Sequence, residues 1–548
     1  LSSYEIGHGH AVAKGIAFTA SLSYDLGWCS IECRDRIHAL LEKFGYDLSI
    51  GFSPSDVANA MASDKKRSGD SIKFIINRDV GQAEIKLISL TKLGEILATY
   101  SEMFPGTSEI VHGGAPLFAP LQEVSAPPSK SYLHREIIAA MLSGHELELD
   151  AQEASEDIIA TFEAVKIISN HANYSAVGIL ESSIVSEDDK LILECKESGS
   201  TLRFLLPVVA ALGLDAEFKL TGRLRERPMQ QLISQLEEHD ASITLSDSGS
   251  ISISASSSHI TPGEFNFTNP ESSQYISGLL FALPLLNGDS VIRVHNNLES
   301  YSYVLMTLDV LGKYGIKVDY SHTNKEWVFN IPGNQTYTFT DISPEGDWSN
   351  AAFLLALGVF GKAPLRINNL PLPSKQGDIK ILDLLEEFGV TVNRYSDILD
   401  VNAGCVDIFP CKELSAINSI DASGFPDLVP ILALIACVAS GKTVIRNAER
   451  LRYKESDRLT ATCKVLRSLG ADISETEDGL IIEGVETLRG SYEGDGCGDH
   501  RIIMMIAVSS LISEGIIRIH EASAVAKSYP NFFEVIKLLG FDDNLELV

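Results

Sequence analysis

The sequence predicts an α/β protein of two domains built from six repeated units of helix and strand, preceded by a mostly helical N-terminal fragment. Six apolar helical segments each begin at a short polar stretch and close on Gly, and these glycines recur every ~70–80 residues. β-rich stretches and amphipathic helices lie between them. Residues 1–105 lie outside the repeat. Six units suit two closed cores better than a solenoid, because no capping repeat is evident.

The apolar helices are expected inside each domain, and the amphipathic helices, with apolar residues at three- and four-residue spacing, around them. The apolar segments are residues 129–144, 199–213, 272–288, 347–361, 427–441 and 499–515. The amphipathic segments include residues 228–239, 303–315, 376–389, 456–470 and 529–540. Residues 443–446 and 516–519 are expected to be strands.

Size and composition limit the function classes. A chain of 548 residues is too long for one core and predicts roughly three or four domains. The net charge of −30 argues against nucleic acid or an anionic membrane as a partner. No apolar run reaches the roughly 18 residues that indicate a membrane span. The eight Cys residues are scattered, as is usual for reduced thiols, so a cytoplasmic location is expected.

The polar stretches that open three apolar helices are candidate anion sites. Residues 129–131, 198–200 and 272–274 are rich in Ser, Gly and Lys. Free N–H groups and the helix dipole favour anions at such N-termini. Any one of them alone indicates ordinary N-capping, whereas several together indicate a shared anion cleft.

Several Lys and Arg residues cluster in a chain that is strongly acidic overall. Each such cluster needs a local explanation. Lys454 and Arg458 are four residues apart in a helical pattern, where a like-charge pair costs ~0.2–0.5 kcal/mol. The alternatives are a solvated charged face and a site for a multiply charged anion. Arg227 precedes Pro228, which suits a first helical turn. His500, next to Arg501, by itself indicates a structural hydrogen bond.

Together these segments resemble the 5-enolpyruvylshikimate-3-phosphate (EPSP) synthase family over nearly all of residues 122–538. The matching motifs, in family order, are residues 128–135, 198–203, 225–228, 272–274, 454–458, 499–501 and Lys527. The resemblance implies a two-domain enolpyruvyl transferase fold of six βαβαββ-like repeats, with the active site between the domains. The first domain would be residues 130–343, and the second residues 121–129 and 344–548.

The resemblance also implies the site residues. Shikimate 3-phosphate would be bound by Lys130, Ser131, Arg135, Ser272, Ser273, Gln274, Ser300, Tyr303, Asp427 and Lys454. Phosphoenolpyruvate would be bound by Lys130, Gly199, Arg227, Gln274, Arg458, Arg501 and Lys527. Asp427, Glu455, Lys130 and Lys527 would be catalytic. The sequence departs from the family pattern at Glu197 and Arg450, where many members have Asn.

These residue types suit the implied chemistry, the transfer of the enolpyruvyl group of phosphoenolpyruvate to the 5-hydroxyl of shikimate 3-phosphate. The planar guanidinium group of Arg can donate two parallel hydrogen bonds to a phosphate or a carboxylate, and the ammonium group of Lys binds either as a compact positive charge. Asp427 would take the hydroxyl proton, and Glu455 would protonate the methylene carbon. The resemblance implies a monomer with these two small-molecule substrates, no cofactor and no metal, and glyphosate is expected to compete with phosphoenolpyruvate.

Residues 1–105 resemble the C-terminal domain of 3-dehydroquinate synthase. Residues 7–15 precede an apolar helix, and residues 64–66, Gly69 and a strand at 72–77 match a later lysine motif. His8 would be a vestigial zinc ligand, and Lys65 or Lys66 would bind substrate. Zinc and NAD belong to a complete synthase, so neither is expected here, and the fragment is expected to be inactive. Residues 106–120 are the expected linker.

Three rival functions remain. UDP-N-acetylglucosamine enolpyruvyl transferase shares the implied fold, but the motifs at residues 130–131 and 454–458 favour the shikimate enzyme. A zinc-dependent lyase would need ligands that residues 1–105 do not supply. A non-catalytic scaffold leaves the intact set of acidic and basic residues unexplained.

Overall fold

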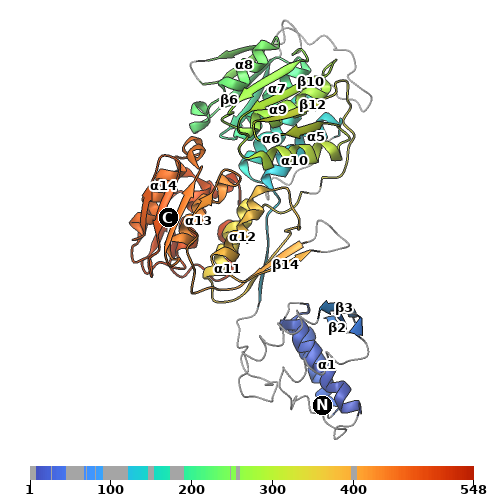
Figure 1. Cartoon of the computed structure of the whole chain (residues 1–548), viewed down its shortest axis with the longest axis vertical. Coiled ribbons are helices and arrows are strands. Elements are labelled where there is room, and N and C mark those ends of the chain that lie inside the picture. Colours follow the sequence, from blue (N-terminus) through green and yellow to red (C-terminus); the bar gives the residue numbers. More distant parts are fainter. Residues whose placement is uncertain are drawn as a thin grey trace. The chain divides into compact units, whose positions relative to one another are not determined.

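The computed structural model divides the chain into two compact units, residues 1–121 and 122–548 (Figure 1). It describes residues 8–25, 28–44, 67–68, 71–79, 82–89, 121–145, 154–172, 190–246, 249–254, 260–342, 344–396 and 404–548.

The N-terminal unit contains two helices and a small sheet. α1 (His8–Asp25) packs against α2 (Ile31–Lys43). β2 (Ser71–Asp79) pairs antiparallel with both β1 (Arg67–Ser68) and β3 (Gln82–Ser89). The strand expected at residues 72–77 lies within β2. The expected lysine motif at residues 64–66 and the linker at 106–120 lie outside the described residues.

Residues 122–548 enclose two clusters of buried apolar side chains. The first core runs from Tyr132 to Tyr337. The second core runs from Trp348 to Phe541 and also includes Val124 and Ala126. Figure 1 shows the elements of each core gathered together. These clusters show which residues pack together, and the expected domain boundaries stay a prediction.

Each core contains three helices that are buried along almost their whole length. They are α5 (Lys130–Leu142), α7 (Gly199–Leu212) and α9 (Ser273–Ala282) in the first core, and α11 (Trp348–Phe360), α13 (Val429–Cys437) and α15 (His500–Ser509) in the second. These are the six apolar segments that the sequence predicts. Their uniform apolarity makes them buried on all sides.

Two of these helices end well before the expected glycine. α9 ends at Ala282 and the 3-10 turn η2 (Leu283–Leu285) follows, because Pro284 within it has no amide hydrogen to continue the α-helix. α15 ends at Ser509, where the Ser509 and Ser510 hydroxyls donate to carbonyls three residues earlier. Such side-chain bonds compete with continuation of a helix.

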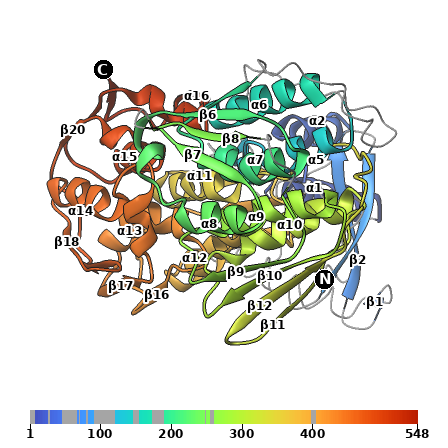
Figure 2. The ribbon, with the colours of Figure 1, turned by 90° about the horizontal axis from the view of Figure 1, so that it is seen from above.

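Four sheets share one repeating order of elements, in which two parallel strands flank a buried helix and two antiparallel strands follow. Their strand orders are β5-β6-β8-β7, β11-β12-β10-β9, β14-β15-β13-β4 and β16-β17-β19-β18. Figure 2 shows β9, β10, β12 and β11 side by side. A fifth sheet, β20-β21-β22, is parallel throughout. The order strand–helix–strand–helix–strand–strand confirms the predicted fold class.

The strands of the first core are β5 (Leu191–Lys196), β6 (Ala216–Leu220), β7 (Ser242–Leu245), β8 (Ile251–Ser254), β9 (Glu264–Thr268), β10 (Ser290–His295), β11 (Asp319–His322) and β12 (Glu326–Ile331). Those of the second are β4 (Gln122–Ser125), β13 (Leu365–Asn368), β14 (Val392–Ser396), β15 (Gly404–Ile408), β16 (Ile420–Asp421), β17 (Lys442–Arg446), β18 (Asp472–Glu475), β19 (Leu480–Glu483), β20 (Tyr492–Gly494), β21 (Ile517–Ile519) and β22 (Leu545–Leu547). The amphipathic helices are α6 (Glu156–Ala172), α8 (Gln230–Glu238), α10 (Tyr301–Lys313), α12 (Ile381–Glu387), α14 (Arg458–Ser468) and α16 (Phe532–Leu538).

The chain passes between the cores twice, through segments that lie side by side. β4 pairs with β13 in the second core before the chain enters the first. The Ser129 amide donates to the Glu345 carbonyl at 2.8 Å, and the Asp347 amide to the Pro127 carbonyl at 2.8 Å. The Asp347 carboxylate accepts a further bond from the Lys130 amide at 3.0 Å. The first turns of α5 and α11 are therefore held next to each other.

Candidate active site

Arg458, the first residue of α14, joins three carboxylates of the second core. Its Nη1 donates to Asp427 Oδ1 at 2.8 Å, its Nη2 to Glu455 Oε2 at 2.6 Å, and its Nε to Asp499 Oδ2 at 2.8 Å. Asp427 lies in the 3-10 turn η4 (Pro426–Leu428), and Asp499 is the N-cap of α15. The Arg458 side chain is 1% exposed, and a cation so deeply buried needs such partners.

The structure corrects the expectation that Lys454 and Arg458 share a helical face. Asp457 caps α14 by accepting the Thr460 amide at 3.1 Å, so the helix begins only at Arg458. Lys454 is in an extended conformation before it. Its Nζ still lies 3.5 Å from Asp427 Oδ1, so the two cations meet at one carboxylate.

The neighbouring cations keep Asp427 and Glu455 ionised. Burial alone raises the pKa of the Asp427 carboxyl, but Lys454, Arg458 and Arg501 together hold it well below its usual range. Burial likewise raises the pKa of Glu455, and Arg458 and Arg227 more than offset this and lower it. Both groups are therefore anions in the substrate-free protein.

Arg227 and Arg501 approach this cluster from two sides. Arg227, from the first core, places Nη2 3.4 Å from Glu455 Oε1. Arg501, from α15, places Nη2 3.6 Å from Asp427 Oδ2 and donates from Nη1 to Asn350 at 3.1 Å. The Nε atoms of both are buried without a hydrogen-bond partner. Arg227 lies ahead of α8, which starts at Gln230, so Pro228 does not occupy the expected first turn.

The two predicted catalytic lysines lie on either side of the junction between the cores. Lys130 Nζ donates to Asp157 at 3.0 Å and lies 3.5 Å from the Lys527 carbonyl. Lys527 Nζ pairs with the Glu197 carboxylate and donates to the Gly498 carbonyl at 3.1 Å. Each ammonium group thus has a carboxylate partner in the described structure.

The N-termini of α7 and α9 lie together. Ser198 and Ser272 cap these helices through the amides of Thr201 and Gln274. The Gln274 side chain donates to Ser200 at 2.9 Å. Gly199 is the first residue of α7, and a Cβ there would lie 3.1 Å from Arg227 Nη1. Ser273, the first residue of α9, is buried beside them.

Arg135 is buried on the first-core side, and its acceptors among the described residues are all neutral. It donates to the Thr307 hydroxyl at 2.8 Å and to the carbonyls of Ser131 and Tyr303 at 2.6 and 2.9 Å. Burial lowers the pKa of its guanidinium to about 10. None of the described partners of this guanidinium carries a negative charge, so a ligand anion would supply one.

Ser300 and Tyr303 belong to the first turn of α10 and reach the second core. The Ser300 hydroxyl donates to the Ser423 carbonyl at 3.3 Å and accepts from Arg450 Nη1 at 3.4 Å. Arg450 also pairs with Glu299 at 2.9 Å. The Tyr303 hydroxyl donates to Asp378 at 3.2 Å. Burial, with Asp427 nearby, raises the pKa of Asp378 to about 7.

Six of the predicted site residues thus meet through ion pairs at the junction of the two cores: Arg227, Asp427, Lys454, Glu455, Arg458 and Arg501. Comparison with known proteins gives the family. Residues 119–536 match the model of EPSP synthase (3-phosphoshikimate 1-carboxyvinyltransferase). This chain belongs to the EPSP synthase family.

Curated relatives and solved structures agree with this family. The 3-phosphoshikimate 1-carboxyvinyltransferase of Clostridium kluyveri is 40% identical over 423 residues, covering 76% of this chain and 95% of that protein. Its Clostridium acetobutylicum counterpart is 38% identical over 427 residues, covering 77% and 95%. The EPSP synthase of Acinetobacter baumannii, 24% identical, has the same fold with a TM-score of 0.59 over 76% of this chain and 95% of its own. The prediction of an enzyme of this family is confirmed.

Residues 1–67 match the 3-dehydroquinate synthase C-terminal model, which confirms the second resemblance. His8 is the first residue of α1, and its side chain is not described. Among the side chains that the structure does describe, no group of three His, Cys, Asp or Glu residues is arranged to hold a metal ion. No helix in the described ranges has the length and apolarity to cross a membrane.

Four residues of this candidate site were not among the site residues predicted from the sequence. Arg203 lies one helical turn after Gly199 and donates to Gln274 at 2.9 Å, so the four-residue spacing could have revealed it. Asp499 was identifiable as a helix-capping residue beside Arg501. Asp157 and Asp378 gave no signal, because their partners are distant in sequence.

His500 is the first residue of α15 and is 2% exposed. Burial, together with Lys130, lowers the pKa of its imidazole well below the usual value, so the ring is neutral. Among the described residues its Nδ1 has no hydrogen-bond partner, so this nitrogen does not make the structural hydrogen bond that the sequence indicated.

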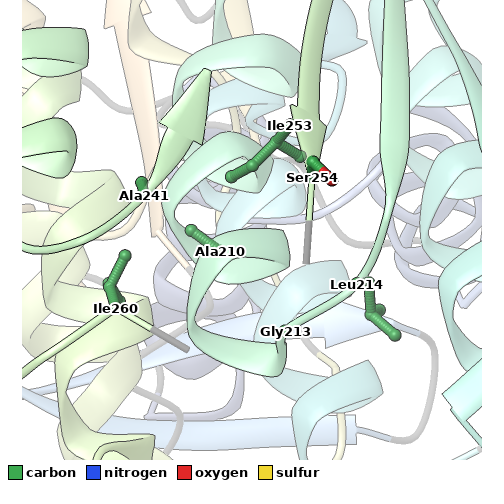
Figure 3. A pocket seen from close by; sticks show the side chains of 7 residues that line it. All are labelled: Ala210, Gly213, Leu214, Ala241, Ile253, Ser254 and Ile260. Carbon is green, nitrogen blue, oxygen red and sulfur yellow. The ribbon is translucent and has the colours of Figure 1, made fainter. Parts of the chain in front are cut away.

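A small hollow elsewhere in the first core is not part of this site. It is lined by Ala210, Gly213, Leu214, Ala241, Ile253, Ser254 and Ile260 (Figure 3). Ser254 contributes the only polar side chain of this lining, so the hollow offers no charge to a phosphate.

Proposed function

We propose that residues 122–548 transfer the enolpyruvyl group of phosphoenolpyruvate to the 5-hydroxyl of shikimate 3-phosphate and release phosphate, in the shikimate pathway to chorismate and aromatic amino acids. One observation carries this proposal. Four Arg side chains keep a buried guanidinium nitrogen that has no hydrogen-bond partner among the described residues: Arg203, Arg227, Arg450 and Arg501. A buried donor without an acceptor is costly. Two substrates that each carry a phosphate and a carboxylate would supply the acceptors.

Phosphoenolpyruvate fits the part of the site where Arg227, Arg458 and Arg501 surround Glu455 and Asp427. Its phosphate and carboxylate would accept from these guanidinium groups and from Lys130 and Lys527. The absence of a side chain at Gly199 leaves space beside Arg227. Gln274 would contact both substrates from the start of α9.

Shikimate 3-phosphate fits between the starts of α5, α9 and α10. Hydroxyls from Ser272, Ser273 and Ser300 suit its phosphate. Arg135 and Tyr303 suit its carboxylate, because a guanidinium and a phenol both donate. Its 5-hydroxyl would face Asp427 and Lys454.

The reaction would begin with two proton transfers and one new bond. Asp427 accepts the proton of the 5-hydroxyl as the oxygen attacks C2 of phosphoenolpyruvate. The π electrons of the C2–C3 double bond take a proton from Glu455, which makes C3 a methyl group. Lys130 and Lys527 balance the charges as they move.

The tetrahedral intermediate would then lose phosphate. The bond between C2 and the phosphate oxygen breaks, and the phosphate takes up the proton held by Asp427. Glu455 removes a proton from C3, and the double bond forms again. All groups in these steps belong to the protein or its substrates, so the transfer itself calls for no cofactor. We further propose that the enzyme acts as a monomer.

Phosphate release tests this function. The chain is assayed with phosphoenolpyruvate alone, with shikimate 3-phosphate alone, and with both. We expect release only with both, and none when UDP-N-acetylglucosamine replaces shikimate 3-phosphate. Release with the nucleotide sugar, or none with the correct pair, would overturn the proposal.

In the same assay, the variant Lys454→Met tests the proposed contact between Lys454 and the substrate. Charge-assisted contacts are worth ~1.5–3 kcal/mol, so kcat/KM should fall about tenfold to a hundredfold. Lys442→Met is the control, because Lys442 is exposed on β17 and pairs only with Glu483 among the described ion pairs.

For the N-terminal unit we propose that residues 1–105 by themselves have no 3-dehydroquinate synthase activity. The family motif in this region supplies one zinc ligand, His8, whereas a catalytic zinc site uses three protein ligands. Turnover of the heptulosonate phosphate substrate by this chain, supplied with NAD and zinc, would contradict the proposal.

A further inference from the structure

Glu197 stands at the junction of the two cores, on the turn between β5 and α7. Its Oε2 pairs with Nζ of Lys527, which ends the 3-10 helix η7 (Ala522–Lys527) of the second core. Its Oε1 accepts from the backbone N–H of Arg223 at 3.3 Å. One carboxylate therefore connects an amide of the first core with an ammonium group of the second.

The fold makes room for this carboxylate. Gly222 has a φ of +52°, and a Cβ on it would lie 1.7 Å from Glu197 Oε1. Any side chain at position 222 would push the carboxylate away from Lys527. The glycine therefore lets the Arg223 amide and the Glu197 carboxylate approach each other.

The partner of Glu197 is a group that the proposed function gives to phosphoenolpyruvate. Lys527 has no other carboxylate among its described partners, and its remaining bond goes to the Gly498 carbonyl. While Glu197 holds the ammonium group, the site presents one cation fewer to an incoming phosphate. An anion that reaches Lys527 must therefore separate this pair or share its cation with a second negative charge.

We propose that Glu197 is a specificity-determining residue that competes with ligand anions for Lys527. This inference rests on the proposed function, because it deepens the role of the phosphoenolpyruvate site. A ligand with one anionic group loses part of its attraction to Lys527 through this competition. It has no second anionic group with which to regain that binding free energy elsewhere in the site. Phosphoenolpyruvate has two such groups and offsets the loss through Arg227, Arg458 and Arg501. Glu197 would thus disfavour inorganic phosphate, which the cell contains and the reaction produces.

The test is a calorimetric titration of the full chain with inorganic phosphate, which needs no turnover. Glu197→Gln keeps the size of the side chain and removes its charge. We expect phosphate to bind this variant roughly tenfold more tightly than the unchanged chain, the scale of a partly screened charge interaction. The KM for phosphoenolpyruvate should fall by more than kcat changes.

Two further variants separate this role from a structural one. Glu194→Gln makes the same charge change three residues earlier, on β5, but Glu194 pairs with exposed Lys219, so phosphate affinity should stay unchanged. Glu197→Asp retains the charge and should bind phosphate as weakly as the original chain. Equal or weaker phosphate binding by Glu197→Gln would overturn the inference. A chain without transferase activity would overturn the proposed function, and the phosphate titration would still decide the role of Glu197.

Discussion

A single guanidinium group organises the candidate site at the scale of residues. Arg458 holds Asp427, Glu455 and Asp499 within hydrogen-bonding distance, and Arg227 adds a second cation to Glu455. These contacts favour the ionised form of Glu455, although the proposed reaction needs it as an acid. Substrate anions that draw Arg227 and Arg458 toward themselves would raise its pKa again. The acid would then form only when the substrate is bound.

Glu455→Gln tests this assignment. The amide keeps the shape of the side chain but cannot exchange a proton with carbon. We expect near-normal binding of shikimate 3-phosphate and a fall in kcat of ~10²–10⁴, the range for losing a general acid or base. Binding is measured by titration and kcat by steady-state phosphate release. Glu449→Gln, on the exposed start of η5 (Glu449–Tyr453), is the control. Weak binding with an unchanged kcat would make Glu455 a binding residue.

Gly199→Ala tests the space beside Arg227. The new methyl group would lie 3.1 Å from Arg227 Nη1, so the Arg227 guanidinium must shift, whereas its 3.5 Å distance to Arg203 Nη1 is an ordinary contact. We expect the KM for phosphoenolpyruvate to rise and the KM for shikimate 3-phosphate to stay the same. Inhibition by glyphosate, which is longer, should weaken further. Gly312→Ala is the control, because a Cβ there meets no atom within 4 Å. Equal losses for both phosphoenolpyruvate and glyphosate would contradict the placement.

The sequence indicated which residues bear charge but not which of them pair. Arg458, Arg501 and Lys527 are recognisable from their motifs. The pairing of Lys527 with Glu197 depends on how the two cores meet, since the partners are 330 residues apart. Residue patterns along the chain carry no information about such a contact.

At the scale of elements, the sequence predicted the buried helices and their starts well, but it predicted the ends of α9 and α15 and the start of α14 less well. A helix buried on all sides needs an apolar residue at nearly every position, so its pattern is unambiguous. Short 3-10 turns such as η5 leave no such pattern. The segment before α14 was therefore expected to be helical, although Lys454 is extended there. Capping by Asp457 sets the true start.

Asp457→Ala should therefore affect stability more than chemistry. Loss of the cap to the Thr460 amide is expected to cost about 1 kcal/mol. This would lower the thermal midpoint by about 1 °C for the unit of residues 122–548, because the shift per kcal/mol shrinks as the unit grows. Asp457→Asn keeps a capping oxygen and should restore most of the midpoint. If Asp457→Ala abolished turnover without lowering the midpoint, Asp457 would belong to the chemistry rather than to the helix.

At the scale of the whole molecule, sixfold repetition predicted the two-core architecture. It could not show how the chain closes the second core. β4 precedes the first core in sequence but pairs in parallel with β13 across residues 122–125, and Val124 is buried in the second core. Only the resemblance to a known family suggested this return, because a four-residue strand has too weak a pattern of its own.

This pairing leads to a prediction about truncation. A chain beginning at residue 119 retains β4 and the whole unit 122–548, which contains both cores and the candidate site. Compact units with their own cores fold alone. We therefore expect the kcat/KM of this fragment to lie within about twofold of that of the full chain, because independent parts of a protein contribute almost additively to its free energies. A chain beginning at residue 129 lacks β4, exposes the edge of β13 and removes Val124 and Ala126 from the second core. It should lose thermal stability and activity together. Similar loss in the longer fragment would show that residues 1–118 support the transferase.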